Sequence, residues 1–373
     1  MPALQEPLVS WAGFLGPQFR APEPVITNHS HRENHFMTLS TVELCAGAGG
    51  QALGIHRAGF KHRALVEIDD HACATLRRNF PGTRVIKADL LKPFDASRFK
   101  GIDLLAAGVP CPPFSVAGKQ LGAADERNLF PAVLQCARDA RPKALMIENV
   151  EGLLKPRFDA YRAFVIEQFH ALGYEVQIRL LDAADFNVPQ RRRRAIIVAL
   201  RPAAMRRFKW PKAFVTTPPT VGKILQPYMA EYGWKDAARW ACRAQEVAPT
   251  IVGGSKKHGG ADLGPSGSRK AWAALGVNGS SLADAAPDKK FVGMPRLTIP
   301  MVARLQGFPS DWVCEGSKTH AYRQVGNALP PQLAQAVARQ IRRAFVTQPA
   351  LDWGSTSLPM GVRVCRDRAE PRP

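Results

Sequence analysis

Cys111 is the residue whose type and position most directly suggest chemistry. It follows Pro110 in the run Asp-Leu-Leu-Ala-Ala-Gly-Val-Pro-Cys-Pro-Pro-Phe-Ser, residues 103–115. The first part of that run is mainly apolar and predicts a short buried strand, so the cysteine stands just beyond a strand end, where open α/β sheets bind ligands. A thiolate at such a place can act as a nucleophile. The alternative is a buried cysteine that packs as a small hydrophobic side chain.

A glycine-rich loop near the start of the chain indicates a nucleotide-like cofactor. Gly47, Gly49 and Ala52 match the G-x-G-x-x-G/A pattern directly after the first predicted strand. Glycine lets a ligand approach the backbone closely. Glu67 and Asp89 end the next two predicted strands, where carboxylates can accept hydrogen bonds from a ribose. The motif alone does not separate NAD from other adenosine-bearing cofactors.

A carboxylate and a run of arginines lie at further strand ends. Glu148 ends a buried apolar strand, and its side chain could equally be a helix cap or an ion-pair partner. Four successive arginines precede the strand of residues 195–200. Alternation along an extended chain sends Arg192 and Arg194 to one face and the other two arginines to the opposite face. A solvated charge run is the alternative, although arginines next to a core strand require anionic or hydrogen-bonding partners.

The elements that must position these residues follow the rhythm of a parallel sheet. From about residue 39 to 200, apolar runs alternate with helical patterns in βαβ order. The expected strands span residues 41–44, 64–67, 84–88, 103–107, 144–148, 175–181 and 195–200. The last two flank a loop without a helix, so we expect them to pair antiparallel. Apolar residues at helical spacing return in residues 330–345 and predict a helix there.

Residues 205–295 interrupt this rhythm with Gly, Pro, Lys and Trp. From residue 208 to 295 there are 12 Lys or Arg against 6 Asp or Glu, and the pattern predicts little regular core. A basic, loop-rich module is suited to a nucleic-acid groove, and an ordinary solvated insertion is the alternative. Residues 1–37 and 347–373 show no clear periodicity, so we expect both to be poorly ordered.

The composition predicts a soluble protein with a polyanionic partner. The 373 residues are 46% hydrophobic, which is ample for a core, and 51 Lys and Arg against 31 acids give a formal charge of +20. Nucleic acid is therefore the first candidate partner. We see no apolar run of about 18 residues and no secretion signal, so we expect no membrane span. Seven cysteines without a C-x-x-C pair argue against a zinc site or a disulfide framework and favour a reducing cytoplasm.

Together these motifs resemble those of the DNA cytosine-5 methyltransferase family. The matching blocks, in the family's order, are residues 43–50, Pro110-Cys111, Glu148-Asn149-Val150, Gln190-x-Arg192-x-Arg194, residues 296–309 and residues 324–330. The resemblance covers about residues 40–345. It implies an α/β fold with a Rossmann-like, S-adenosylmethionine-dependent sheet that is mostly parallel with an antiparallel last strand. It also implies a catalytic domain of residues 38–204 and 296–346 and a small irregular target-recognition domain of residues 205–295.

The resemblance implies a covalent mechanism without a metal. Cys111 would add to carbon 6 of a cytosine flipped out of duplex DNA. Glu148 would contact the ring N3 and the exocyclic amine, and Arg194 would hold the O2 side, with Arg192 in the same catalytic group. Carbon 5 would then accept the methyl group of S-adenosylmethionine and lose its proton, which expels the cysteine. Residues 112–127 resemble the family's catalytic loop, which closes over DNA.

Matching positions also imply a cofactor pocket. The expected cofactor contacts are Cys45, Gly47, Ala48, Gly50, Glu67, Ile68, Asp89, Pro110, Leu129, Asn327 and Ala328. The family usually has an aromatic residue where this chain has Cys45, so stacking on the adenine would be lost or replaced. The match at Asn327 implies that the C-terminal helix packs back beside the first strand.

The recognition segment supplies candidate DNA contacts. They are Gln190, Arg239, Arg243, Thr250, Lys256, Lys257 and Arg269. Thr250-Ile251 resembles the Thr-aliphatic pair typical of target-recognition domains, whose side chains read bases in the major groove. We therefore predict a prokaryotic type II enzyme that acts as a monomer on double-stranded DNA, in the cytoplasm and associated with the nucleoid. A cognate restriction endonuclease, from which methylation protects host DNA, is the predicted functional partner.

Three other functions share some of these features. A tRNA cytosine-5 methyltransferase would use the same thiol and cofactor, but the stretch after Glu148 lacks the Cys-Phe-Thr signature of that relative. An inactive DNA-binding regulator on the same fold would not need every catalytic position filled. An NAD dehydrogenase would explain the glycine loop but would give no role to Cys111 together with Glu148.

Overall fold

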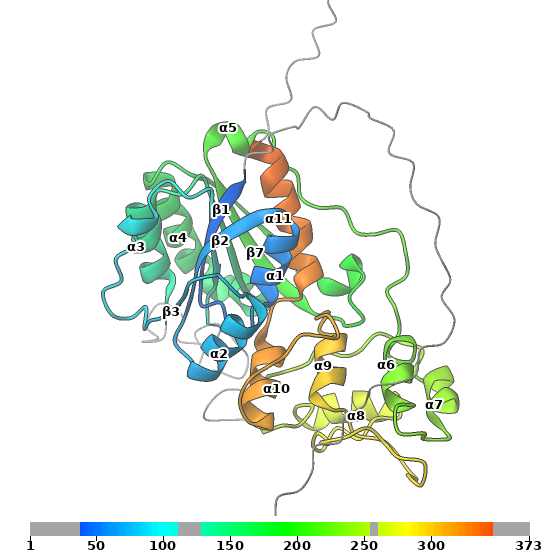
Figure 1. Ribbon diagram of the computed structural model, residues 1–373. Coiled ribbons are helices and arrows are strands. Elements are labelled where there is room, and N and C mark those ends of the chain that lie inside the picture. Colours follow the sequence, from blue (N-terminus) through cyan, green and yellow to red (C-terminus); the bar gives the residue numbers. More distant parts are fainter. Residues whose placement is uncertain (1–37, 111–127, 254–259, 346–373) are drawn as a thin grey trace, which may run out of the picture. The chain divides into compact units, whose positions relative to one another are not determined.

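Seven strands form one mixed sheet in the order β3-β2-β1-β4-β5-β7-β6 (Figure 1). This computed structural model describes residues 38–110, 128–253 and 260–345. The strands are β1 Leu39–Leu44, β2 Phe60–Glu67, β3 Val85–Lys87, β4 Leu104–Gly108, β5 Ala144–Val150, β6 Glu175–Asp182 and β7 Arg193–Leu200. Neighbours from β3 to β5 run parallel, whereas β7 runs antiparallel to both β5 and β6, which confirms the predicted pairing of the last two strands.

Some sequence predictions fall outside the described residues. They concern Cys111, Lys256, Lys257, the loop at 112–127 and the two chain ends. The described residues from Thr38 onward belong to one compact unit.

Helices cover both faces of the sheet. On one face lie α1 Gly50–Arg57 and α11 Pro331–Phe345, and on the other lie α3 Phe130–Ala140 and α4 Asp159–Ala171 (Figure 1). Residues of β4 alternate between the two hydrophobic clusters, because successive side chains of a strand point to opposite faces. Covered faces explain why the central strands read as continuous apolar runs.

The C-terminal helix α11 packs directly on α1, the helix that follows the first strand. Two glycines of α1 permit this close approach. A Cβ at Gly54 would lie 2.4 Å from the carbonyl oxygen of Pro331, and a Cβ at Gly50 would lie 2.3 Å from that of Leu329. Glycine is therefore required at both positions by packing of the returning chain.

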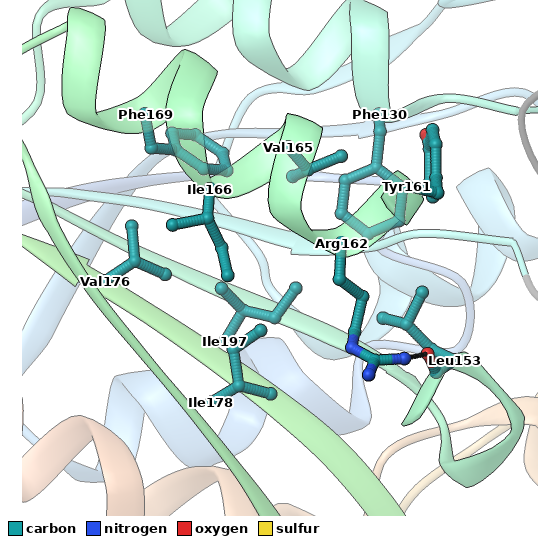
Figure 2. Close-up of a pocket in the computed structure, with 10 residues that line it drawn as sticks. All are labelled: Phe130, Leu153, Tyr161, Arg162, Val165, Ile166, Phe169, Val176, Ile178 and Ile197. Atoms are coloured by element: carbon teal, nitrogen blue, oxygen red, sulfur yellow. Dashed lines mark hydrogen bonds between the residues drawn. The ribbon is translucent and has the colours of Figure 1, made fainter. Parts of the chain in front are cut away.

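A small apolar crevice lies between α4 and the sheet (Figure 2). Phe169 of α4 lines it together with Val176 of β6 and Ile197 of β7. Its charged side chain, Arg162, donates a 2.7 Å hydrogen bond to the carbonyl oxygen of Leu153. None of the described residues around the crevice is a carboxylate, a histidine or a thiol. A phenol, Tyr161, is the polar side chain beside Arg162 in this lining, and it hydrogen-bonds to Asn128.

The predicted absence of a regular core in residues 205–295 is wrong. Trp240 and Trp272 are fully buried, and the Trp240 indole N–H donates to the carbonyl oxygen of Leu275 at 3.1 Å. The α-helices between β7 and α11 are α5 Pro202–Met205, α6 Val221–Met229, α7 Ala237–Arg243, α8 Ser266–Ala274, α9 Ile299–Leu305 and α10 Lys318–Asn327. Glycines and prolines separate helices too short to show a clear period, which hid this core from the sequence pattern. No helix in the described part of the chain combines the length and the apolar character needed to cross a membrane.

Candidate active site

The carboxyl ends of β1, β4 and β5 meet at one edge of the sheet. Gly108, the last residue of β4, shows how closely they approach. A Cβ built there would lie 3.1 Å from the carbonyl oxygen of Cys45 and 4.0 Å from Oε2 of Glu148. The glycine loop after β1 and the carboxylate of β5 therefore lie within about one side chain of each other. This is the edge at which open α/β sheets bind ligands.

The backbone that leads to Cys111 is held against β5. Asn149 is fully buried, and its Nδ2 donates to the carbonyl oxygen of Val109 at 3.5 Å. Its Oδ1 accepts from the backbone N–H of Val150 at 2.8 Å. Val109 and Pro110 are the last described residues before the cysteine. Asn149 thus fixes the start of the Pro-Cys loop next to the strand that carries Glu148.

Glu148 and Arg194 form an ion pair beside that loop. Arg194 Nε lies 2.9 Å from Glu148 Oε1, and the two side chains are 13% and 7% exposed. Antiparallel pairing of β5 and β7 places Val150 opposite Arg194, which brings the two groups together. Burial raises the pKa of Glu148, while the positive charges of Arg194 and Arg192 lower it. A carboxyl that retains its proton more readily than usual is suited to proton donation.

Arg192, predicted to belong to the catalytic group, is held by backbone groups of two other segments, and its positive charge lowers the pKa of Glu148. Its side chain is buried, and its NH1 and NH2 groups donate to the carbonyl oxygens of Ile251 and Gly326, each at 2.8 Å. The predicted alternation is correct, since Arg192 and Arg194 are sheltered and their two neighbours are exposed. Arg192, however, joins the recognition segment to the end of α10.

Gln190, predicted to contact DNA, has its side chain in the interior of the protein. It is completely buried, its Nε2 donates to Oε1 of Gln306 at 2.6 Å, and its Oε1 accepts from the backbone N–H of Ile251 at 3.0 Å. Gln306 in turn donates to the carbonyl oxygen of Ala328. Buried amide groups need such partners, so Gln190 and Gln306 serve the interior. Gln306 was missed from the sequence, although it lies inside the matched block 296–309.

Glu67 organises the edge expected to hold the cofactor. Its Oε2 accepts from the backbone N–H of Gly47 at 2.8 Å, and its Oε1 accepts from those of Ile68 and Asp69 at 2.8 and 2.9 Å. A carboxylate offers about four acceptor sites, so three bonds leave one for a hydroxyl group. Glu67 can therefore hold the loop and still accept a hydrogen bond from a ribose.

The surface beside Glu67 is open on the side of the glycine loop. A Cβ at Gly47 would meet nothing within 4 Å, and the loop turns there with a φ of 53°. Ile68 is 55% exposed and presents an apolar surface. Asp89, two residues after the end of β3, accepts from the backbone N–H of Leu91 at 3.0 Å through Oδ1. An exposed aliphatic side chain between two carboxylates fits an adenosine group.

Cys45 adopts a left-handed backbone conformation with a φ of 53°, which is strained for a residue with a Cβ. Burial raises the pKa of its thiol, so this cysteine stays neutral and is not a nucleophile. Other expected cofactor residues are divided between the interior and the surface. Ala48, Gly50, Leu129 and Ala328 are buried, Pro110 is half-buried, and Asn327 is exposed.

An open cleft of about 330 Å³ adjoins Arg194. It is lined by Val150, Glu151, Gly152, Asp182, Arg191, Arg193, Arg194 and Thr250. Thr250 lies in the wall of this cleft, and its hydroxyl donates to the carbonyl oxygen of Arg191 at 2.7 Å. Arg239 and Arg243 on α7 and Arg269 on α8 are exposed and do not line this cleft.

Among the described residues, no three His, Cys, Asp or Glu side chains gather as they would around a metal.

Comparison with known proteins decides the family. A model described as C-5 cytosine-specific DNA methylase matches residues 39–343. The chain belongs to that family. Type II methyltransferase M.NaeI of Lentzea aerocolonigenes is 51% identical over 314 residues, covering 83% of this chain and 76% of the relative. M.NgoMIV of Neisseria gonorrhoeae, another type II methyltransferase, is 49% identical over 312 residues, covering 83% and 99%.

Solved structures show the same fold for this methylase. A substituted form of Spodoptera frugiperda DNMT2 superimposes with a TM-score of 0.56 at 18% identity, covering 82% of this chain and 99% of that one. The predicted family, the Rossmann-like fold class and the activity of a DNA cytosine-5 methyltransferase are thereby confirmed. The roles of individual site residues stay predictions.

Proposed function

We propose that this methylase is a type II enzyme that methylates carbon 5 of one cytosine in a specific duplex DNA site through a covalent adduct with Cys111. The observation that carries the proposal is the meeting of three strand ends. The Pro-Cys loop leaves β4 at Gly108, where a Cβ would lie 4.0 Å from Oε2 of Glu148. A nucleophile, an acid and a cofactor loop are needed on one edge, and the sequence supplies candidates for each there.

The chain's own residues divide the work on the target base. The Cys111 thiolate forms a bond to carbon 6, and the electron pair displaced from the ring is stabilised because Glu148 protonates or hydrogen-bonds N3. Arg194, paired with Glu148 at 2.9 Å, orients that carboxyl and faces the O2 side. After methyl transfer, loss of the carbon 5 proton to a base restores the ring double bond and breaks the sulfur–carbon bond. The thiol's ordinary pKa of about 8.5 requires a local field that favours the anion.

S-adenosylmethionine supplies the methyl group as an electrophilic methyl sulfonium. Glu67 retains one acceptor site for a ribose hydroxyl, and Gly47 leaves the backbone accessible. Ile68 offers an apolar surface to the adenine. In the family, an aromatic residue at the position of Cys45 usually also packs against this ring. Asp89, Pro110, Leu129, Asn327 and Ala328 complete the proposed pocket, and no metal takes part in this scheme.

Duplex DNA is the proposed partner. The formal charge of +20 and the exposed arginines Arg239, Arg243 and Arg269 favour it, together with Lys256 and Lys257 in the sequence. The type II relatives suggest protection of host DNA against a cognate restriction endonuclease. We propose that the enzyme acts as a monomer in the cytoplasm, at the nucleoid.

Bisulfite sequencing tests the activity directly. DNA from a methylation-free host that expresses the full chain should show protected cytosines within one recurring sequence, and Cys111→Ala should abolish protection. Parallel sequencing of tRNA separates the RNA alternative. No protected cytosine in DNA, with DNA binding equal in parent and Cys111→Ala, would support the regulator alternative.

A mechanism-based probe tests the adduct. Duplex DNA with 5-fluorocytosine at the target should form a denaturation-resistant complex with the parent, because fluorine at carbon 5 blocks the elimination that releases the cysteine. The complex should be absent in Cys111→Ala. A stable complex in that variant would exclude Cys111 as the nucleophile.

A further inference from the structure

The proposed reaction gives no role to two arginines that face the cleft. Side chains alternate along residues 190–194, so Gln190 and Arg192 enter the interior while Arg191 and Arg193 point outward. The exposed fractions of the two outward side chains are 65% and 55%. Both line the same 330 Å³ cleft as Arg194.

Each outward arginine is oriented by a carboxylate across the cleft. Arg193 NH2 lies 2.7 Å from Oε1 of Glu151, and Arg191 NH1 lies 3.6 Å from Oδ2 of Asp182. Asp182 is itself fixed, because its Oδ1 accepts from the backbone N–H groups of Arg192 and Ala184 at 2.9 and 3.2 Å. Exposed ion pairs of this kind contribute little to folding stability. They do restrict the directions in which the guanidinium groups point.

We propose that Arg191 and Arg193 bind a backbone phosphate of the DNA strand that carries the target cytosine, and that Glu151 and Asp182 position them. The inference rests on the proposed function, since it takes the base to lie at Glu148. Each carboxylate contacts one nitrogen of a group that has five N–H donors, so further donors remain for a second anion. A planar guanidinium group matches the two oxygens of a phosphate in bidentate geometry.

The location favours a phosphate of the flipped nucleotide. Arg194 both contacts Glu148 and lines the cleft, so it separates the position of the base from the open space outside. A nucleotide whose base reaches Glu148 must carry its sugar and phosphate outward past Arg194. The cleft with Arg191 and Arg193 is the described opening on that side. Phosphate contacts of this kind fix register without reading sequence.

The site is tested by combining the arginine variants with DNA in which one phosphate is either charged or neutral. Duplexes containing the sequence found by bisulfite sequencing are prepared with charged phosphates or with a methylphosphonate next to the target cytosine. On the charged duplex, Arg191→Gln and Arg193→Gln should each weaken binding roughly tenfold and reduce the slope of log affinity against log salt by about 0.9. On the neutral duplex, at least one of them should bind as the parent does.

Arg78→Gln is the matched control. Arg78 is 60% exposed and pairs with a carboxylate, Glu315, at 3.3 Å, but it does not line the cleft. Its replacement should leave DNA affinity and the salt slope unchanged. Affinity for S-adenosylmethionine should be unchanged in all three variants, which verifies that they fold.

The proposed role of Glu151 in positioning Arg193 has a separate test. Glu151→Gln should tighten binding to non-specific DNA, because the cleft becomes more positive, and should lower the ratio of specific to non-specific affinity. In the Arg193→Gln background the same change should have no effect on that ratio. If Arg191→Gln and Arg193→Gln resemble Arg78→Gln while the parent methylates DNA, the phosphate site is wrong and the proposed function stands. If the parent protects no cytosine, the proposed function fails as well.

Discussion

Two buried carboxylates, one at the edge of the sheet and one in its interior, have different partners. Glu148 lies against the cation Arg194 at 2.9 Å, beside the open cleft. Glu43 on β1 faces His62 on β2, with 3.8 Å between Oε2 and Nε2 and both side chains 1% exposed. Burial raises the pKa of Glu43 well above its usual value and lowers that of His62 to about 4. The interior pair is therefore neutral, whereas at the edge the positive charge of Arg194 lowers the pKa of Glu148 against the effect of burial.

Other polar atoms around the interior pair reinforce the contrast. Thr41 Oγ1 and both amide atoms of Gln51 are buried and have no hydrogen-bond partner among the described residues. Glu43 Oε2 and both ring nitrogens of His62 share this condition. Burial raises the pKa of both carboxyls, and Glu148 differs in having cationic neighbours that lower it. The carboxyl with a cationic partner therefore lies at the edge where a ligand is expected, and the neutral pair lies in the interior.

The largest expected difference is in catalysis. Glu148→Gln should lower the single-turnover methylation rate roughly 10³-fold, because the amide cannot donate the proton that N3 needs. Glu43→Gln should change that rate by no more than a few-fold, since no substrate atom reaches the interior pair. Equal losses in the two variants would contradict a distinction between edge and interior.

A smaller effect is expected on stability when the edge pair loses its cation. Arg194→Leu leaves Glu148 without its partner, which should reduce the free energy of unfolding by about 3 kcal/mol at pH 8. The pKa of Glu148 is already raised and should rise further, so the folded state binds a proton more tightly than the unfolded state. Stability of the variant should therefore fall as pH rises. Urea unfolding at pH 6 and pH 8 measures this, with Glu148→Gln/Arg194→Leu as a control that should lack the pH dependence.

Local sequence patterns were sufficient to predict the strands of the sheet and the edge of the sheet at which the candidate site lies. Apolar runs marked all seven strands, and parallel order alone brings the loop after β1 and Glu148 to the same edge. The faces of Arg192 and Arg194 also followed from alternation. What Arg192 binds did not, because the carbonyl groups of Ile251 and Gly326 lie 59 and 134 residues away along the chain.

The contact between Glu43 and His62 could not be predicted from the sequence for a similar reason. The sequence pattern marks Glu43 only as part of the glycine block, residues 43–50. Its meeting with His62 depends on the register of β1 and β2, which shifts between Thr41 and Val42. Short-range periodicity contains no information about such a shift. The buried tryptophans of residues 205–295 were missed because their partners come from several short helices.

Two single variants of the interior pair, His62→Gln and Glu43→Gln, should show opposite dependences of the free energy of unfolding on pH. In His62→Gln, Glu43 keeps its proton in the folded state but loses it on unfolding above its usual pKa, so stability should fall by about 2 kcal/mol from pH 5 to pH 6.5. In Glu43→Gln, His62 binds a proton in the unfolded state but not in the folded state, whose pKa is about 4. Stability should then rise by about 2 kcal/mol over the same range.

These two slopes should cancel in the parent. Between the usual pKa values of a carboxyl and an imidazole, the folded pair holds one proton on Glu43 and the unfolded pair holds one on His62. Urea unfolding of all three proteins at pH 5 and pH 6.5 tests the cancellation. If either variant lacks its slope, the remaining group keeps its usual pKa in the folded state, which would contradict a neutral interior pair.

The smallest expected effect concerns Thr41, which lies opposite His62 in the sheet. Thr41→Val removes a buried hydroxyl that lacks a partner in the described structure, so the free energy of unfolding should rise by up to about 1 kcal/mol. Thr75 is the matched control, because it is equally buried but its hydroxyl donates to Gln324 at 2.6 Å and accepts from the Glu315 backbone N–H at 2.8 Å. Thr75→Val should cost about 1–3 kcal/mol. If thermal unfolding shows both valine variants destabilised alike, ordered water bonds Thr41, and the interior cluster is a hydrated network and not a set of unpaired groups.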